Sequence, residues 1–464
     1  MANERYRTTR TLKEEPEDEP LSTGIYISRA AVAGKAAVLP DKDSKLGDNT
    51  IVVIREADNT WFPLIRQASA VIIEEGSIAQ HFSQMLREMN MPSVICAKGA
   101  TDKILDGQEI TIHPGERIKS NFPQGYVREG IHELIETTER LPDYPKTKTE
   151  VFSICSFKGG IEKLKHSPMA GIGLMRADFL NNYLFGIHPL AMVDYANGTL
   201  IDNDARRALD KMFGDLGVTR EKALDYYIDV VAKQIFEVAQ HIPGKRINYR
   251  VFDLNSGESR KLIGGAMYEL VENNPMMGER GVTKFISNSY RPALELECAI
   301  MNAAIEYGVN LHPIVPFCRT PEDGKEAIRL IREQGISKAE VGGMIELPIN
   351  VILADRFADQ FDYMVFGPMD MTQSLYMADR GTTSLSDYCN FDNDGTRESV
   401  NVMLRRLEGY SKDIFIIAYE VFSGLGDFMK YQGDNRLHLI SFPDNFEDNI
   451  FRLSKLEERV EYKK

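Results

Sequence analysis

The chain has 464 residues, of which 43% are hydrophobic and 27% charged, enough for one large core and a second, smaller one. Its formal net charge of −14, without a long Lys/Arg run, argues against binding to nucleic acid or to an anionic membrane. No stretch approaches the roughly 18 apolar residues of a membrane span, and the N-terminus lacks the basic and apolar regions of an export signal.

The first 150 residues predict a tail, a small domain and a linker. Residues 1–20 are charged and contain proline with almost nothing to bury, which predicts a disordered or partner-docking tail. Residues 21–124 combine short apolar strands and turns with one amphipathic helix, which indicates a compact α/β module. Residues 125–150 begin with a short helical pattern and end in a Pro- and charge-rich stretch, which predicts a linker.

Residues 151–464 predict a (β/α)8 barrel. Apolar runs typical of buried strands alternate there with helical segments, and their number matches the eight strands of this fold. The long interval between the second and third runs predicts inserted helices at 180–240. The runs are residues 151–157, 171–175, 247–252, 311–317, 341–347, 363–367, 414–420 and 437–442.

Charged side chains follow several of these runs. The active site of such a barrel lies at the C-terminal ends of the strands, so these side chains are expected to converge. Carboxylates there suit Mg²⁺, and arginines suit phosphate or carboxylate groups. Ordinary strand-end charges would explain one such residue, but explain several matching positions less well. The residues are Arg176, Arg250, Asp253, Arg319, Glu346 and Asp370.

Two further segments are candidates for binding an anion. The Pro- and Gly-rich loop at 273–281 contains Arg280, although such loops are also plain turns. In the small domain, a helical stripe of Phe82, Met85, Leu86 and Met89 leaves His81 in the first turn, off the stripe. Free backbone N–H groups there favour an anion, and a neutral imidazole is a competent nucleophile. Alone, this segment favours a helix-capping surface histidine.

From about residue 21 to 460 the chain resembles the phosphohistidine and barrel domains of the PEP-utilising enzymes, which include phosphoenolpyruvate synthase and, more distantly, pyruvate phosphate dikinase and enzyme I of sugar phosphotransferase systems. The resemblance implies a swivelling α/β phosphohistidine domain followed by a (β/α)8 TIM barrel. The motifs that carry it, in the family's order, are GIGLMRADF at 171–179, GIHP at 186–189, NPMMGERG at 274–281, VPFCRT at 315–320, IELPIN at 345–350 and MDMTQ at 369–373.

The resemblance also implies roles for individual residues. His81 would be the phosphoryl carrier, while Glu346 and Asp370 would hold Mg²⁺. The phosphorylated substrate would be gripped by arginines, namely Arg176, Arg250 and Arg280, with Arg319 in support.

Four departures from the family's pattern bear on the reaction. The family begins with an ATP-grasp domain, for which there is no room upstream of residue 21, so a separate subunit would supply it. GSIAQH at 76–81 lacks the threonine that usually precedes the histidine. The cysteine that exchanges a proton with the pyruvate carbon is replaced by Ala418, followed by Tyr419. The Ser-Asn pair before the metal aspartate reads Pro368-Met369.

These departures favour an acceptor that needs no carbon protonation. An apolar pocket that includes Met369 suits a phenol-like hydroxyl compound, as in phenylphosphate synthase, and Tyr419 or Glu420 could assist deprotonation of the hydroxyl. One alternative is a component of a split phosphoenolpyruvate synthase. Another is a catalytically inactive regulatory or binding homologue, which the missing threonine and cysteine favour and the retained charged residues oppose.

The expected partners and location follow from the same observations. The resemblance implies an ATP-grasp partner subunit, a small hydroxyl acceptor and, as in relatives that dimerise through the barrel, a homodimer as one option. Five widely spaced cysteines without a CxxC pair fit neither a disulfide framework nor structural zinc. A reducing cytoplasm is therefore expected.

Overall fold

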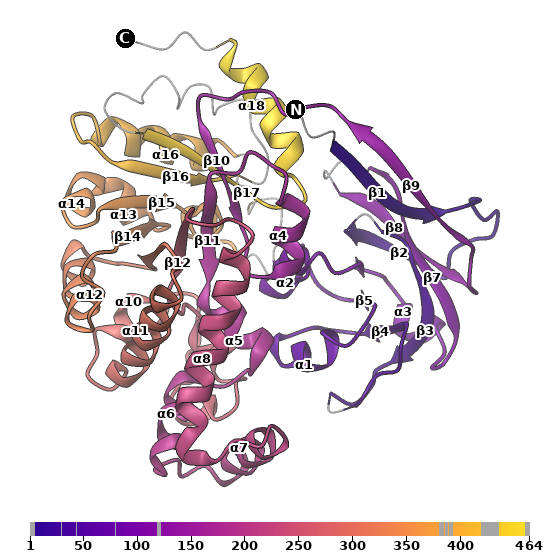
Figure 1. Cartoon of the computed structure of the whole chain (residues 1–464), viewed down its shortest axis with the longest axis horizontal. Helices are drawn as coiled ribbons and strands as arrows, with labels where there is room; N and C mark the ends of the chain where they lie inside the picture. The colour runs from indigo at the N-terminus through magenta and orange to yellow at the C-terminus, as the bar shows by residue number, and fades with distance from the viewer. Residues whose placement is uncertain are drawn as a thin grey trace. The chain divides into compact units, whose positions relative to one another are not determined.

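The computed structural model describes residues 5–28, 30–42, 44–78, 80–117, 122–379, 385, 388, 393–418 and 436–459. The chain forms two compact units that divide between Tyr144 and Pro145 (Figure 1). No helix of the described part is both long and apolar enough to cross a membrane.

The N-terminal unit is built around a closed barrel with the strand order β2-β6-β5-β4-β3-β7-β8. Parallel pairing joins β3, β4, β5 and β6, whereas β7 and β8 pair antiparallel with their neighbours. The strands are β2 (Ser22–Ile27), β3 (Val32–Val38), β4 (Thr50–Ile54), β5 (Ala70–Ile73), β6 (Ser93–Ile95), β7 (Glu109–Arg117) and β8 (Pro123–Glu129). The helices are η1 (Asn59–Trp61), α1 (Phe62–Ile65), α2 (His81–Met89) and α3 (Ala100–Lys103).

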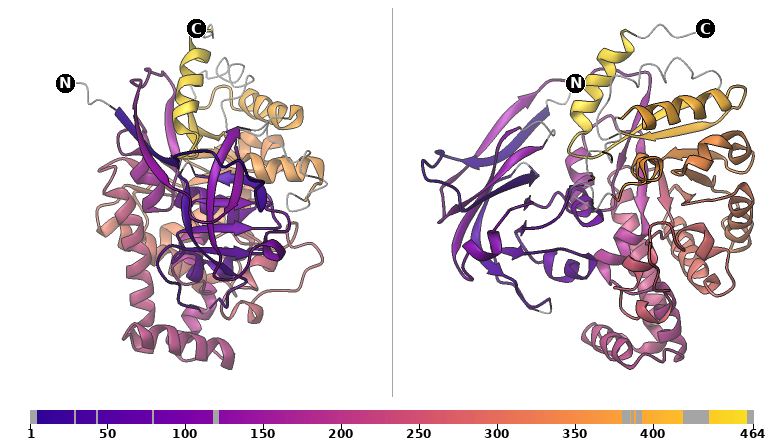
Figure 2. Two further views of the ribbon diagram at one scale, coloured as in Figure 1. Left: turned by 90° about the vertical axis from the view of Figure 1, so that its right-hand side faces the viewer. Right: turned by 180° about the vertical axis from the view of Figure 1, so that it is seen from behind.

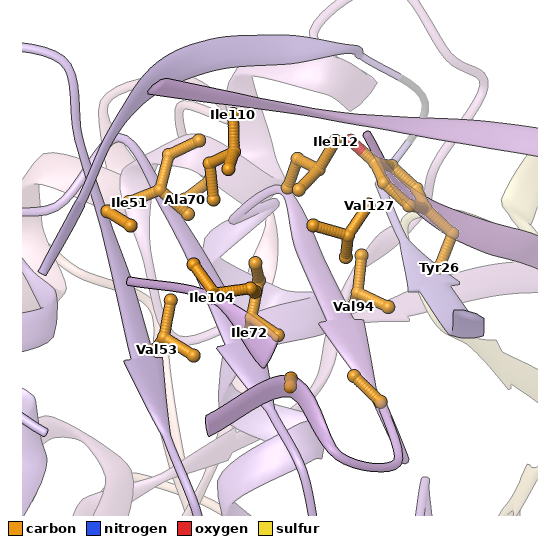
Figure 3. Packing of buried hydrophobic residues seen from close by; sticks show 13 residues of the cluster. Tyr26, Ile51, Val53, Ala70, Ile72, Val94, Ile104, Ile110, Ile112 and Val127 are labelled. Atoms are coloured by element: carbon orange, nitrogen blue, oxygen red, sulfur yellow. The ribbon is translucent and has the colours of Figure 1, made fainter. Parts of the chain in front are cut away.

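Aliphatic side chains fill the inside of this small barrel. Figure 3 shows Ile51, Val53 and Ile72 from the parallel strands facing Ile110 and Val127 from β7 and β8. All five are fully buried. Because β-branched residues pack well on a pleated surface, this composition favours the strands that position the loop before α2.

Two sequence predictions about the ends of this unit are wrong. Residues 1–20 are not a disordered tail in their described part, because β1 (Arg5–Leu12) is a strand. The helical pattern near residue 134 is also a strand, β9 (Leu134–Leu141), which pairs antiparallel with β1 along its whole length. Threonines drive this outcome, since their branched side chains favour strands, and Thr8 and Thr138 hydrogen-bond across the ribbon at 3.1 Å. Because both strands are polar and bury little surface, their sequences lack the apolar pattern by which strands are predicted.

The C-terminal unit is a closed barrel of eight parallel strands in chain order, so the prediction of a (β/α)8 barrel is confirmed. Each strand lies within or next to one of the eight apolar runs. The strands are β10 (Glu150–Ile154), β11 (Gly171–Arg176), β12 (Arg246–Arg250), β13 (Leu311–Val315), β14 (Gly342–Ile345), β15 (Tyr363–Phe366), β16 (Asp413–Ile417) and β17 (Arg436–Ser441). A core of alternate residues, among them Leu174, Ile314, Met344 and Phe415, fills the interior, as expected for a packed barrel.

Helices surround the strands, as Figures 1 and 2 show. The predicted inserted helices are present, and α6, α7 and α8 extend away from the strands at one end of the unit. The helices are α4 (Lys158–Leu164), α5 (Ala177–Leu184), α6 (Pro189–Asn197), α7 (Asn203–Asp215), α8 (Arg220–Ala239), α9 (Ser256–Ser259), η2 (Gly265–Met267), α10 (Val282–Phe285), α11 (Arg291–Glu306), α12 (Pro321–Glu333), α13 (Pro348–Ile352), α14 (Ala354–Ala358), α15 (Pro368–Tyr376), α16 (Asp394–Arg406) and α18 (Phe446–Glu457).

Candidate functional site

A chain of buried ion pairs crosses the C-terminal end of the large barrel. Arg250 donates to Asp178 at 2.8 Å and lies 3.5 Å from Asp253. Asp253 accepts from Arg280 at 2.7 and 3.3 Å, and Arg280 also donates to Asp370 at 3.3 Å. All five side chains are buried. Charged side chains that are buried away from water are stable only when they are paired. The charged form of each of these five side chains therefore depends on its ion-pair neighbours.

The fold explains how residues so far apart in sequence meet. Arg250 is the last residue of β12 and Asp253 follows three residues later. Arg280 immediately precedes Gly281 and α10, while Asp370 lies in the first turn of α15, just after β15. Because the C-terminal ends of parallel barrel strands open on one face, the polar residues after them converge there. The predicted convergence of Arg250, Asp253 and Asp370 is therefore present, and Arg280 from the Pro- and Gly-rich loop joins them.

Glu346 lies beside this chain of ion pairs, directly after β14. Its side chain is 1% exposed, and its Oε1 accepts the backbone N–H of Phe317 at 2.7 Å. Burial raises the pKa of Glu346 to about 8, and the negative charges of Asp253 and Asp370 raise it further. The positive charges of Arg280 and Arg250 lower this pKa and oppose part of the rise. Three carboxyl groups are thus close enough to influence one another electrostatically.

The raised pKa of Glu346 makes stability depend on pH. Between the ordinary carboxyl pKa of about 4.3 and the folded value, the folded chain holds a proton that the unfolded chain has released. Without divalent metal, the free energy of unfolding should therefore fall by up to about 1.4 kcal/mol per pH unit as pH rises across this window. Urea unfolding in EDTA should show this decline in the wild type and a flatter profile in Glu346→Gln. Equal slopes would contradict the raised pKa.

The two remaining arginines occupy different environments. Arg176, the last residue of β11, is buried with its guanidinium carbon 3.9 Å from the ring centre of Phe179. Arg319 is half-buried and donates to the Thr283 hydroxyl at 2.5 Å and to the carbonyl of Gly278. Arg319 therefore anchors the loop that carries Arg280, which agrees with a supporting position.

The predicted acceptor side of the site is described only in part. Met369 is half-buried, next to Asp370 in the first turn of α15. Ile417 ends β16 with its side chain in the barrel core, and Ala418 is fully buried after it. Tyr419 and Glu420 lie outside the described residues, so their predicted role in deprotonating the hydroxyl stays a prediction.

His81 is the first residue of α2 in the N-terminal unit, as predicted. Of the predicted stripe beneath it, Phe82, Met85 and Leu86 are buried, whereas Met89 is only half-buried. The ring of Phe82 stacks on that of Phe62, with 4.5 Å between the ring centres. His81 itself is half-buried. The stripe fixes the helix, and the start of the helix provides the backbone N–H groups that an anion on the imidazole needs.

A second polar cluster, which we call the Glu269 cluster, was missed by sequence reasoning. Glu269 accepts from both Lys284, at 2.7 Å to each oxygen, and Tyr290 at 2.5 Å. His188 lies 3.1 Å from Glu269 and 2.7 Å from the Tyr290 hydroxyl. Lys284 also donates to the carbonyl of Leu254 at 3.4 Å, so the cluster braces the segment beside Asp253. Only the GIHP motif at 186–189 hinted at it.

Two family models match this chain. The model "PEP-utilising enzyme, mobile domain" covers residues 46–116, and the model "PEP-utilising enzyme, PEP-binding domain" covers residues 134–414. The chain belongs to the PEP-utilising enzyme family. The first match contains His81 and the second contains Arg176, Arg250, Arg280, Arg319, Glu346 and Asp370, so the motifs that suggested this family are correctly assigned.

Curated members of the PEP-utilising enzyme family resemble the chain over most of its length. Phosphoenolpyruvate synthase of Synechocystis is 28% identical over 95% of this chain and 54% of its own, and that of Aquifex aeolicus is 28% identical over 97% and 58%. A probable phosphoenolpyruvate synthase of Staphylothermus marinus is 31% identical over 81% and 44%. The chain thus spans about half the length of the curated relatives it matches.

Proposed function

We propose that this chain carries a phosphoryl group on His81 and transfers it in the large barrel to the hydroxyl of an apolar, phenol-like acceptor. One observation carries the choice of acceptor. The described end of β16 has only hydrocarbon side chains, Ile416, Ile417 and Ala418, at the place where the family motif has a cysteine. These side chains cannot give a proton to a carbon atom. Transfer to oxygen needs no such donor.

The charged residues suit the transfer itself. In the proposed step the nitrogen–phosphorus bond of phosphohistidine breaks, an oxygen–phosphorus bond to the acceptor forms, and the hydroxyl proton passes to a base. Negative charge on the phosphoryl oxygens must be stabilised in the transition state, which is the main task of residues in phosphoryl transfer. Arg250 and Arg280 are held rigidly for this by Asp178, Asp253 and Asp370.

The donor set fits Mg²⁺ that is shared with the phosphorylated substrate. No group of three or more His, Cys, Asp or Glu side chains able to hold a metal occurs among the described residues. From the family resemblance and their place after β14 and β15, Glu346 and Asp370 are the two protein ligands proposed, a number that Mg²⁺ accepts when phosphate oxygens and water complete its shell. The bound ion would neutralise charge on the transferring phosphoryl group.

We also propose that a partner subunit with an ATP-grasp domain loads His81. The proposal rests on the resemblance to the PEP-utilising enzymes, in which an ATP-grasp domain phosphorylates the histidine.

Reverse transfer tests the acceptor without any partner subunit. The purified chain is incubated with Mg²⁺ and with phosphate-labelled phenyl phosphate or phosphoenolpyruvate, and acid-labile label on the protein is measured. Phenyl phosphate, but not phosphoenolpyruvate, is expected to label the wild type, with no label on His81→Ala. Label from phosphoenolpyruvate would favour the second candidate, a split phosphoenolpyruvate synthase, which the names of the relatives support. Failure of both donors would indicate an inactive homologue.

A further inference from the structure

We propose that Phe317 is a positioning residue that aligns both the phosphate-binding and the metal-binding sides of the barrel site, the first through its ring and the second through its backbone N–H. The inference rests on the proposed function, since it concerns the alignment of Arg280 and Glu346. Phe317 is buried two residues after the end of β13, in the VPFCRT segment. A phenylalanine ring takes no part in proton or phosphoryl transfer, so Phe317 would contribute by holding other groups in position.

The ring of Phe317 lies against two guanidinium groups. Its centre is 4.2 Å from the guanidinium carbon of Arg280 and 5.0 Å from that of Arg319. Both distances are within the range of cation–π attraction, which is stronger where water is excluded. Two like charges otherwise repel, and the proximity of Arg280 contributes to lowering the pKa of Arg319 below its usual value, after the larger effect of burial. The ring therefore offsets repulsion that would push Arg280 away from Asp253 and Asp370.

The backbone of Phe317 adopts a conformation that bulky side chains avoid. Its φ is +53°, in the left-handed region. Backbone strain of this kind persists only where surrounding contacts hold it, and it is concentrated at functional sites. In this conformation the N–H of Phe317 points at Oε1 of Glu346, 2.7 Å away. With a negative φ the N–H would point away from Glu346. Because the contacts of the ring help to hold the positive φ, they also help to maintain the hydrogen bond to Glu346.

Gly281 completes the arrangement from the neighbouring loop. Its φ is +58°, and a Cβ built on it would meet the Cβ of Phe317 at 2.6 Å and Oδ1 of Asp253 at 3.1 Å. The next residue, Val282, donates its N–H to the carbonyl of Pro316 at 3.1 Å. The loop after Arg280 is thus docked on the carbonyl of Pro316 and the Cβ of Phe317. This explains why Arg280 and Glu346, which belong to different strand ends, share one support.

Two substitutions separate the role of the ring from that of the backbone. Phe317→Leu removes the ring and leaves a side chain that disfavours positive φ, so both Arg280 and Glu346 should lose alignment. Phe317→Gly also removes the ring, but glycine adopts φ near +53° without strain and can keep the N–H on Glu346. Phe357→Leu, in which a fully buried ring is removed from α14, is the matched control.

The experiment titrates the whole chain with Mn²⁺ by electron paramagnetic resonance and with inorganic phosphate by calorimetry. In Phe317→Leu both affinities should fall by about tenfold or more, the loss typical of residues that orient a metal ligand. In Phe317→Gly only the phosphate affinity should fall, although this variant removes more buried surface. Phe357→Leu should change neither. Equal Mn²⁺ losses in the leucine and glycine variants would show a structural role alone and overturn the inference.

A ligand-free measurement distinguishes failure of this inference from failure of the proposed function. A wild type that binds neither Mn²⁺ nor phosphate would count against the proposed site. The ring contact is then tested by urea unfolding of Phe317→Leu, Arg280→Met and the double variant. The double variant should lose less stability than the sum of the single variants, because residues in contact are coupled. Simple additivity would overturn the positioning of Arg280 by Phe317 whatever the ligands do.

Discussion

Replacing Arg280 by methionine is expected to lower the free energy of unfolding by about 3–5 kcal/mol and to slow phosphoryl transfer by about 10³-fold. The side chain is 1% exposed and pairs with both Asp253 and Asp370. Its loss removes one cationic partner from each of two buried carboxylates, and removes the positive charge that would face the phosphoryl group. Urea unfolding and single-turnover transfer from phosphorylated His81 measure the two effects.

The origin of the loss can be checked with pH and with a second substitution. Acidification should restore part of the stability of Arg280→Met, because the carboxyl groups that lost this partner become neutral. Adding Asp253→Asn should also recover stability but not the transfer rate. Arg329→Met is the matched control, since Arg329 contacts Glu326 and Glu333 on the exposed face of α12 and should matter little. A loss in Arg280→Met no larger than in this control would contradict the buried ion-pair chain.

Replacing Lys284 by methionine is the second change with a large expected effect, again about 3–5 kcal/mol in the free energy of unfolding. Lys284 and Glu269 are each no more than 6% exposed and are bonded at 2.7 Å. Burial would raise the pKa of Glu269, yet hydrogen bonds from His188, Lys284 and Tyr290 and the charge of Lys284 hold that pKa below its usual value. The carboxylate thus depends on its partners.

A double substitution separates an unpaired charge from lost packing. Lys284→Met with Glu269→Gln should be more stable than Lys284→Met alone, because the glutamine leaves no buried charge. Lys233→Met is the control, since its ion pair with Asp229 at 2.6 Å lies on the exposed surface of α8. Urea unfolding of the whole chain provides the comparison. Equal losses in Lys284→Met and Lys233→Met would contradict a structural role for the Glu269 cluster.

The large barrel could be predicted because buried parallel strands have a simple sequence pattern. Strands covered on both faces read as continuous apolar runs, so β10 to β17 stood out, and the residues after them could be assigned to one face. Arg250, Glu346 and Asp370 were found by this rule alone. Asp253 was noted at a strand end, but its contacts with both Arg250 and Arg280 depend on the folded structure and could not be predicted from the sequence.

The failed predictions share a physical cause. β1 and β9 are separated by more than a hundred residues, bury little surface and gain their stability from pairing with each other. The Glu269 cluster joins His188, Glu269 and Tyr290 from three segments, and no local pattern marks such a meeting. The positive φ of Phe317 also could not be predicted from the residue type, because phenylalanine rarely adopts a positive φ.

Whether His81 carries the phosphoryl group can be measured on the protein itself. The chain and the proposed ATP-grasp partner are incubated with phosphate-labelled ATP and Mg²⁺, and the labelled peptide is identified by mass spectrometry for the wild type and for His81→Ala. Acid-labile label is expected on His81 of the wild type, and none is expected on the variant. Label that persists on His81→Ala, or a wild type labelled neither by ATP nor by a phosphorylated acceptor, would contradict this expectation.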